Sequence, residues 1–122
     1  MIVAIDIGNT RIKWGLHDGS GWLCRSALPT SEAERLAEVA ADWPAQVPVV
    51  ACNVAGAGAE ATVELALSHR TVLRWLRSGP AACGVNNAYE QPETLGADRW
   101  AALIGARGRV SGACLVVCAG TA

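Results

Sequence analysis

The sequence has 122 residues, of which 52% are hydrophobic and 17% charged, and it carries a formal net charge of −1 at pH 7. A chain of this length and composition is expected to form one soluble domain with a hydrophobic core. Lysine and arginine are not clustered, so direct nucleic-acid binding is not expected. No apolar stretch is long enough to span a membrane, and no signal-peptide pattern begins the chain, so we expect a cytoplasmic protein.

The first predicted strand covers residues 1–5, a continuous apolar run rich in β-branched residues that is typical of a strand buried on both faces. Asp6 follows it directly. The alternation of Ile12, Trp14 and Leu16 then predicts a second strand, so that a polar turn joins two neighbouring strands.

The turn between these strands contains Gly8, Asn9 and Thr10. Glycine lets another group approach the backbone closely, and the next two side chains can donate hydrogen bonds. Such a turn can bind a phosphate, while Asp6 can hold an accompanying Mg²⁺ directly or through water. An acidic β-turn without a ligand is the structural alternative.

The remaining chain alternates between predicted helices and strands. Ser31 and Glu34 have the spacing of a capping box at the start of an amphipathic helix. We expect strands at 22–28, 47–52, 72–76 and 113–118, helices at 31–43, 57–69 and after Pro92, and a loop at 78–91. Three antiparallel strands followed by alternating helices and strands predict an α/β fold with a mixed sheet flanked by helices, close to the ribonuclease H-like arrangement.

Cysteine and tryptophan give two further expectations. The five cysteines include no C-x-x-C pair, so neither a disulfide framework nor a zinc site is expected, and most should be buried thiols. The five tryptophans take the place of phenylalanine, which is absent, and are expected to be core anchors.

A second group of polar residues lies around the start of the last predicted helix. Arg99 can bind a carboxylate or phosphate with its planar guanidinium, and Asp98 can accept a proton from an alcohol that attacks phosphorus. Tyr89 could orient the same substrate. The structural alternative is an acid favoured by the helix dipole beside a solvated arginine.

Residues 118–122 form a third candidate, a Gly-Thr turn after an apolar run that could bind an anion. A competing pattern begins at Gly56 and Gly58, which fit the dinucleotide fingerprint G-x-G-x-x-A. An antiparallel meander precedes it and no acid follows some twenty residues on, so small residues that let a helix pack closely are the simpler interpretation.

Three motifs, taken in order, resemble those of type III pantothenate kinases: residues 6–15, Tyr89 with residues 95–100, and residues 120–122. The resemblance spans the chain. It implies two ribonuclease H-like domains with ATP in the cleft, as in acetate kinase, sugar kinases, Hsp70 and actin. It also implies transfer of the ATP γ-phosphate to pantothenate, the first step of coenzyme A synthesis, by a homodimer that uses Mg²⁺ and a monovalent cation such as K⁺ or NH₄⁺.

The resemblance also implies roles for single residues. Asp6 would serve Mg²⁺ and the phosphates, and Lys13 would add charge nearby. Asp98 would be the general base on the pantothenate hydroxyl, and Arg99 would bind the pantothenate carboxylate. The other phosphate-binding residues would be Gly8, Asn9, Thr10, Gly120 and Thr121, and the other pocket residues Tyr89, Gly96 and Ala97.

Two departures from the family pattern qualify this interpretation. Cys118 stands where an acid commonly precedes the Ala-Gly-Thr-Ala turn, and a thiol is a poor Mg²⁺ ligand. Residues 1–112 are expected to be the N-terminal domain and 113–122 the start of a truncated second one, so the chain alone should be inactive. Cys118 also favours an alternative, a non-catalytic accessory or transcriptional regulator of the same fold.

Overall fold

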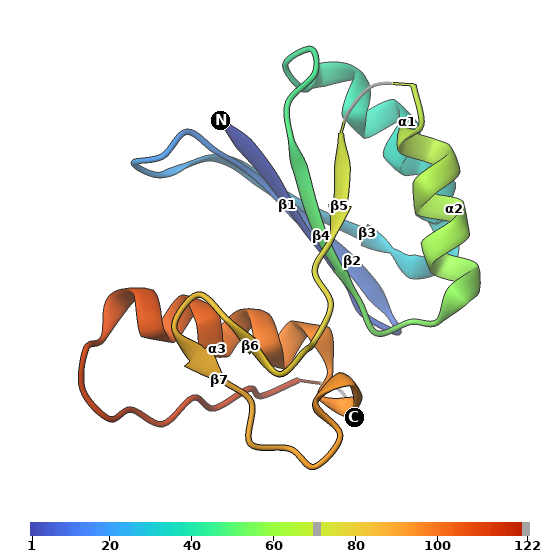
Figure 1. Ribbon diagram of the computed structural model, residues 1–122. Helices are drawn as coiled ribbons and strands as arrows, with labels where there is room; N and C mark the ends of the chain where they lie inside the picture. The colour runs from blue at the N-terminus through green and yellow to red at the C-terminus, as the bar shows by residue number, and fades with distance from the viewer. Residues whose placement is uncertain (70–71, 121–122) are drawn as a thin grey trace. The chain divides into compact units, whose positions relative to one another are not determined.

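The structure is a computed structural model that describes residues 1–69 and 72–120. The chain divides into two compact units, Met1–Leu76 and Arg77–Ala122 (Figure 1). This division falls earlier in the chain than the predicted boundary between residues 112 and 113, which stays a prediction. None of the helices in the described ranges is long and apolar enough to cross a membrane.

The first unit is built on a five-stranded mixed sheet of order β3-β2-β1-β4-β5. β1 pairs antiparallel with β2 and parallel with β4, β2 pairs antiparallel with β3, and β4 pairs parallel with β5. The predicted ribonuclease H-like mixed sheet is therefore confirmed. Its strands are β1 (Ile2–Ile7), β2 (Arg11–His17), β3 (Trp22–Pro29), β4 (Val49–Asn53) and β5 (Leu73–Trp75).

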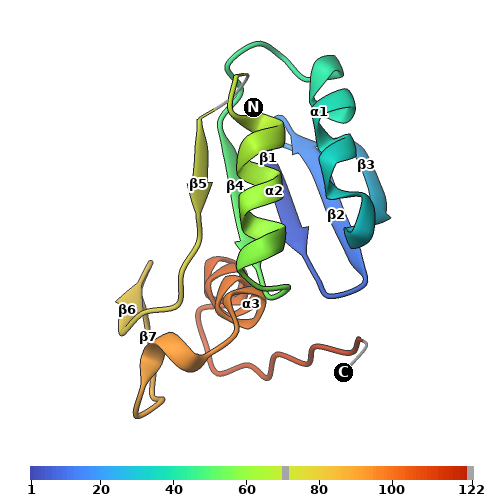
Figure 2. The same cartoon turned by 90° about the vertical axis from the view of Figure 1, so that its right-hand side faces the viewer.

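Helices cover one face of this sheet, as Figure 2 shows for α1 and α2. The predicted helix at 31–43 forms as three short pieces, η1 (Thr30–Arg35), α1 (Leu36–Val39) and η2 (Ala40–Asp42), and α2 spans Ala57–Leu67. The predicted capping box is wrong, because Pro29 is the N-cap and no side chain caps the helix. Glu32 has non-helical dihedral angles, which breaks the first turn and spoils the capping-box spacing.

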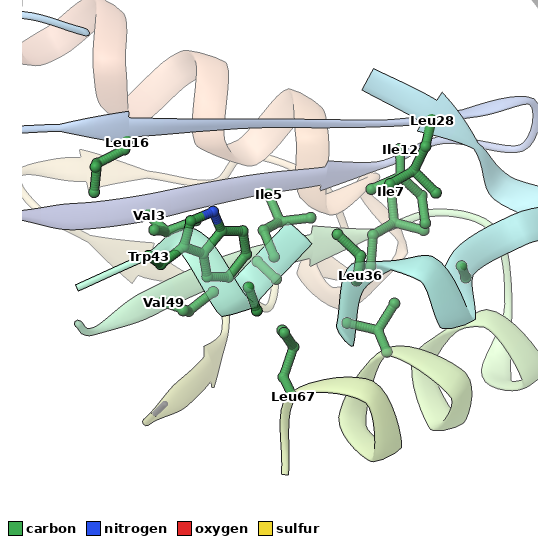
Figure 3. Close-up of a cluster of buried hydrophobic side chains, with 14 of the residues drawn as sticks. Val3, Ile5, Ile7, Ile12, Leu16, Leu28, Leu36, Trp43, Val49 and Leu67 are labelled. Carbon is green, nitrogen blue, oxygen red and sulfur yellow. The ribbon is translucent and has the colours of Figure 1, made fainter. Parts of the chain in front are cut away.

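The core lies between the sheet and these helices, where side chains of β1, β2 and β4 point toward those of α1 and α2 (Figure 3). The prediction that β1 is buried on both faces is wrong. Val3, Ile5 and Ile7 are buried, whereas Ile2 is exposed and Ala4 is intermediate. Helices cover only one face of β1 in this unit, so its burial alternates with the period of two that a half-covered strand shows.

The second unit contains a hairpin whose two strands have two residues each, and one long helix. β6 (Ala81–Ala82) pairs with β7 (Val85–Asn86) inside the stretch predicted as a loop. After η3 (Pro92–Thr94), α3 spans Ala97–Arg109, which confirms the predicted helix. Arg107 near its end donates hydrogen bonds to the carbonyls of Val110 and Ser111, as expected where a helix leaves carbonyl groups unpaired.

The predicted buried strand at 113–118 is wrong, because these residues form no strand and most are exposed, Leu115 by 89% and Val117 by 77%. An apolar run becomes a strand only where a neighbour pairs with its N–H and C=O groups, and no strand pairs with it among the described residues. The prediction for buried cysteines is also wrong: only Cys52 is buried, and Cys24, Cys83, Cys114 and Cys118 are exposed.

The tryptophans divide between core and surface. Trp43 and Trp100 are buried as expected, whereas Trp22 is 49% exposed. The ring of Trp22 lies over Gly15, where a Cβ would come within 2.7 Å of it. Trp22 therefore packs on the backbone of β2 at the protein surface and does not belong to the core.

The buried face of α2 makes a testable prediction about the core. Leu67 is 1% exposed and Leu65 on the same helix is 77% exposed. We expect Leu67→Ala to lower the free energy of unfolding by about 2–5 kcal/mol through lost burial and a cavity. The matched variant Leu65→Ala should change it by less than about 0.5 kcal/mol. Urea unfolding of the 122-residue chain measures both, and equal effects would contradict this core.

The turn between β2 and β3 makes a second prediction. Asp18 accepts hydrogen bonds from the backbone of Gly21 and then from the backbone and hydroxyl of Ser20, which lower its pKa to about 2. The stabilisation is therefore complete above the unfolded pKa near 3.8 and is lost as the pH falls through about 2. We expect Asp18→Asn to destabilise the chain at pH 6, by a difference that vanishes toward pH 2.

NMR titration of the Asp18 carboxyl group tests the same cause. Ser20→Ala removes one of the three donors, so the pKa of Asp18 should rise in that variant. An Asp18 pKa that does not respond to Ser20→Ala would contradict the assigned cause.

Candidate functional site

The first group of candidate residues lies at the end of β1. Asp6 belongs to the strand itself and not to the residues after it, because pairing with β2 and β4 continues through Ile7. Its register partners are Lys13 on β2 and Cys52 on β4. The Lys13 ammonium lies 3.7 Å from Oδ2 of Asp6, and the two side chains are 67% and 45% exposed. The structure thus brings Asp6 and Lys13 together, and their binding of phosphate stays a prediction.

The turn that follows is closed by a hydrogen bond from the Gly8 N–H to the Arg11 carbonyl, 3.0 Å between N and O. A Cβ on Gly8 would lie 3.2 Å from that carbonyl oxygen, which is a close approach for any other residue. Asn9 and Thr10 at the tip are exposed. Their backbone N–H groups donate no hydrogen bond to any residue in the described part of the chain, so both are available to an anion.

Thr30, the first residue of η1, holds this turn in place, and no sequence motif pointed to it. Its hydroxyl donates to the Gly8 carbonyl at 2.7 Å, and its backbone N–H donates to the Thr10 carbonyl at 3.0 Å. Two carbonyl oxygens of the turn are therefore occupied by Thr30. The contact joins residues about twenty positions apart, so no local sequence signal could have revealed it.

The donor set at the end of β1 fits Mg²⁺ that arrives with a nucleotide. No three His, Cys, Asp or Glu side chains gather as a metal cage within residues 1–69 and 72–120. Mg²⁺ is typically bound through one or two carboxylates together with substrate phosphates, and Asp6 offers one such carboxylate. Asp6 can bind the cation while the adjoining N–H groups bind the phosphates that accompany it. This end of β1 therefore suits a cation that is bound to a nucleotide better than a free cation.

The second group lies at the start of α3. Gly96 is the N-cap, and Ala97, Asp98 and Arg99 form the first turn. The backbone N–H of Arg99 donates to Oδ1 of Asp98 at 2.8 Å, so this carboxylate satisfies one of the free N–H groups of the helix start. The exposed Arg99 guanidinium forms no ion pair with the described residues, which leaves it able to bind an anion.

Asn87 organises the loop that carries Tyr89, and the sequence analysis did not identify it. Its side chain accepts a hydrogen bond from the Tyr89 N–H and donates one to the Pro92 carbonyl. Its own N–H donates to the Pro80 carbonyl at 2.8 Å. Tyr89 is 49% exposed on a loop that is thus fixed at both ends.

The remaining candidates differ in how far the structure describes them. Gly120 is exposed, and Thr121, predicted to bind phosphate, lies outside the described residues. Gly56 is the N-cap of α2 with a φ of 92°, a conformation that favours glycine. A Cβ on Gly58 would meet no heavy atom within 4 Å, so the interpretation of these glycines as close-packing residues is wrong.

The strand order and directions of the first unit are those of a ribonuclease H-like mixed sheet. The family model for type III pantothenate kinase matches residues 2–122. The chain therefore belongs to the type III pantothenate kinase family.

Similar proteins of known sequence include three type III pantothenate kinases. Those of Dechloromonas aromatica and Aromatoleum aromaticum are 48% and 47% identical over the whole of this chain, and that of Nitrosospira multiformis is 42% identical. The chain covers 52%, 51% and 47% of these three proteins, so it spans about half their length.

Similar solved structures include a ROK hexokinase from Thermus thermophilus, with a TM-score of 0.41 and 20% identity over 63% of this chain and 35% of that one. A PPX-GPPA enzyme from Aquifex aeolicus has a TM-score of 0.37 and 12% identity over 61% of this chain and 35% of that one.

Thr30 makes the prediction for this site. Thr30→Val keeps the shape of the side chain but leaves the Gly8 carbonyl without its hydroxyl donor, so we expect a loss of about 0.5–1.5 kcal/mol in the free energy of unfolding. Amide exchange of Gly8 should also become faster. Thr62→Val is the matched control, because the Thr62 hydroxyl donates only within its own helix. Equal exchange at Gly8 in both variants would contradict the role of Thr30.

Proposed function

We propose that the full-length protein transfers the γ-phosphate of ATP to the primary alcohol of pantothenate and forms 4'-phosphopantothenate, the first step of coenzyme A synthesis. The observation that carries this proposal is the match of the family model over residues 2–122. The chemistry of the two residue groups supports it, because phosphoryl transfer depends on positioning and charge neutralisation more than on covalent catalysis.

The first group would bind the nucleotide phosphates. The N–H groups of Asn9 and Thr10 donate to no other acceptor in the described chain. Lys13 on the neighbouring strand β2 adds a positive charge beside Asp6. Asp6 would hold Mg²⁺, which when bound neutralises phosphate charge. Gly8 allows the close turn, and Gly120 and Thr121 would belong to a second phosphate-binding turn.

The second group would act on pantothenate. Oδ1 of Asp98 accepts the Arg99 N–H, which leaves Oδ2 to accept the proton of the attacking hydroxyl. Arg99 would bind the pantothenate carboxylate through two parallel hydrogen bonds. Tyr89, Gly96 and Ala97 would line the same pocket. A monovalent cation such as K⁺ or NH₄⁺, a homodimeric assembly and a cytoplasmic location complete the proposal.

Cys118 supports a second candidate, a non-catalytic accessory or regulatory protein of the same fold. A thiol at this position is a poor ligand for Mg²⁺. An assay of the full-length protein with pantothenate, ATP, Mg²⁺ and K⁺ separates the two candidates. Turnover by the unaltered protein excludes the non-catalytic candidate, and turnover that appears only in Cys118→Asp identifies a lapsed enzyme.

Asp98 gives the first kinetic prediction. Asp98→Asn in the full-length protein should lower kcat by about two to four powers of ten, the usual contribution of a general base. Glu93→Gln is the matched control, because Glu93 is an exposed acid just ahead of the same helix. Steady-state kinetics of both variants provide the measurement. A kcat for Asp98→Asn close to that of Glu93→Gln would remove Asp98 from the role of base.

Arg99 gives the second kinetic prediction. Arg99→Lys retains the charge but loses the two-pronged contact with a carboxylate, so the KM for pantothenate should rise about tenfold or more while the KM for ATP stays unchanged. Arg109→Lys, at the other end of α3, should alter neither constant. An effect of Arg99→Lys confined to ATP would show that Arg99 serves the nucleotide instead.

A further inference from the structure

Cys52 is the only buried cysteine among the described residues, and its thiol lies against the proposed metal ligand. The parallel register of β1 and β4 aligns Cys52 with Asp6, and Sγ donates a hydrogen bond to Oδ1 at 3.5 Å. On the other side, the Lys13 ammonium lies 3.7 Å from Oδ2. Each oxygen of the Asp6 carboxylate therefore has a different neighbour.

The side chains of Cys52 and Lys13 differ in how freely they can move. Cys52 is 8% exposed and held within β4, so its thiol stays where the strand register places it. Lys13 is 67% exposed on a flexible side chain, so it can move aside when a cation or phosphate arrives. An ionised carboxylate only accepts hydrogen bonds, and a neutral thiol can donate one. Oδ1 is thus engaged by the protein, and Oδ2 is the oxygen that remains for a ligand.

We propose that Cys52 is a positioning residue that occupies Oδ1 of Asp6, so that Asp6 presents a single oxygen to the metal. This inference rests on the proposed function, in which Asp6 binds Mg²⁺. Mg²⁺ requires near-octahedral geometry and usually takes few carboxylate oxygens, whereas Ca²⁺ readily accepts both oxygens of one carboxylate. Restricting Asp6 to one oxygen therefore favours Mg²⁺ over Ca²⁺.

Three variants of the full-length protein test this role. Cys52→Ala removes the donor, Cys52→Ser replaces the thiol with a hydroxyl donor, and Cys24→Ala changes an exposed cysteine on β3. Calorimetry measures ATP affinity with Mg²⁺ and with Ca²⁺. We expect Cys52→Ala to shift the ratio of the two affinities toward Ca²⁺ by about three- to tenfold, the effect of losing one weak hydrogen bond. Cys52→Ser and Cys24→Ala should keep the original ratio.

The infrared S–H stretching band of the 122-residue chain tests the hydrogen bond itself. The difference spectrum between wild type and Cys52→Ala isolates the band of Cys52, which should lie at lower frequency than the band isolated with Cys24→Ala. Asp6→Ala should move it back. A band at the frequency of an exposed thiol overturns the proposal, and so does a lowered band with an unchanged ratio of Mg²⁺ to Ca²⁺ affinity.

Both measurements are made without turnover, which separates this inference from the proposed function. A protein that binds ATP with Mg²⁺ but does not phosphorylate pantothenate refutes the proposed function only. Absence of metal-dependent ATP binding overturns both.

Discussion

The pairing of β1 with two neighbours of opposite direction is the constraint on which the first unit depends. β1 is antiparallel to β2 and parallel to β4, so Ile7 has a register partner on each side, Ile12 and Asn53. A strand paired on both sides has a fixed register, because a shift by one residue would turn Val3, Ile5 and Ile7 out of the core. The burial of these three side chains thus determines which residue stands at each position on the opposite face.

The register of β1 with β2 and β4 determines which residues lie beside Asp6. Asp6 stands between two core residues of β1, and its side chain is on the face opposite theirs. The same register brings Lys13 and Cys52 to its two sides. The turn after β1 is fixed by Thr30, the first residue of η1, which donates to two of the turn's carbonyl groups and leaves the N–H groups of Asn9 and Thr10 without an acceptor in the described chain. Burial on one face of the sheet therefore determines which residues meet around Asp6 on the other face.

Much of this arrangement could be predicted from the sequence, because the signals were local. The alternation in β2 and the amphipathic pattern of residues 31–43 are properties of short segments, and they indicated the mixed sheet and its covering helix. The resemblance of three ordered motifs indicated the family. The contacts of Cys52 and Thr30 could not be found in this way, since they depend on register between strands distant in the chain.

The sequence-based predictions that were wrong or incomplete have related physical causes. Residues 113–118 have the composition of a buried strand, but composition specifies a strand only together with a partner to pair with it. The same reasoning explains β1, whose apolar run predicted two buried faces although helices cover one. Asn87 was missed because its importance comes from three hydrogen bonds within an irregular loop, a pattern without periodicity.

The most direct test of this account is the response of the backbone amide resonances of the full-length protein to ATP with Mg²⁺, measured by NMR. The resonances of Asn9 and Thr10 should shift strongly, because their N–H groups are the proposed phosphate donors. Ser20 and Gly21, in the turn at the other end of β2, should not shift, because Asp18 already engages both N–H groups. Unchanged resonances at Asn9 and Thr10 under conditions where ATP binds would contradict the central claim.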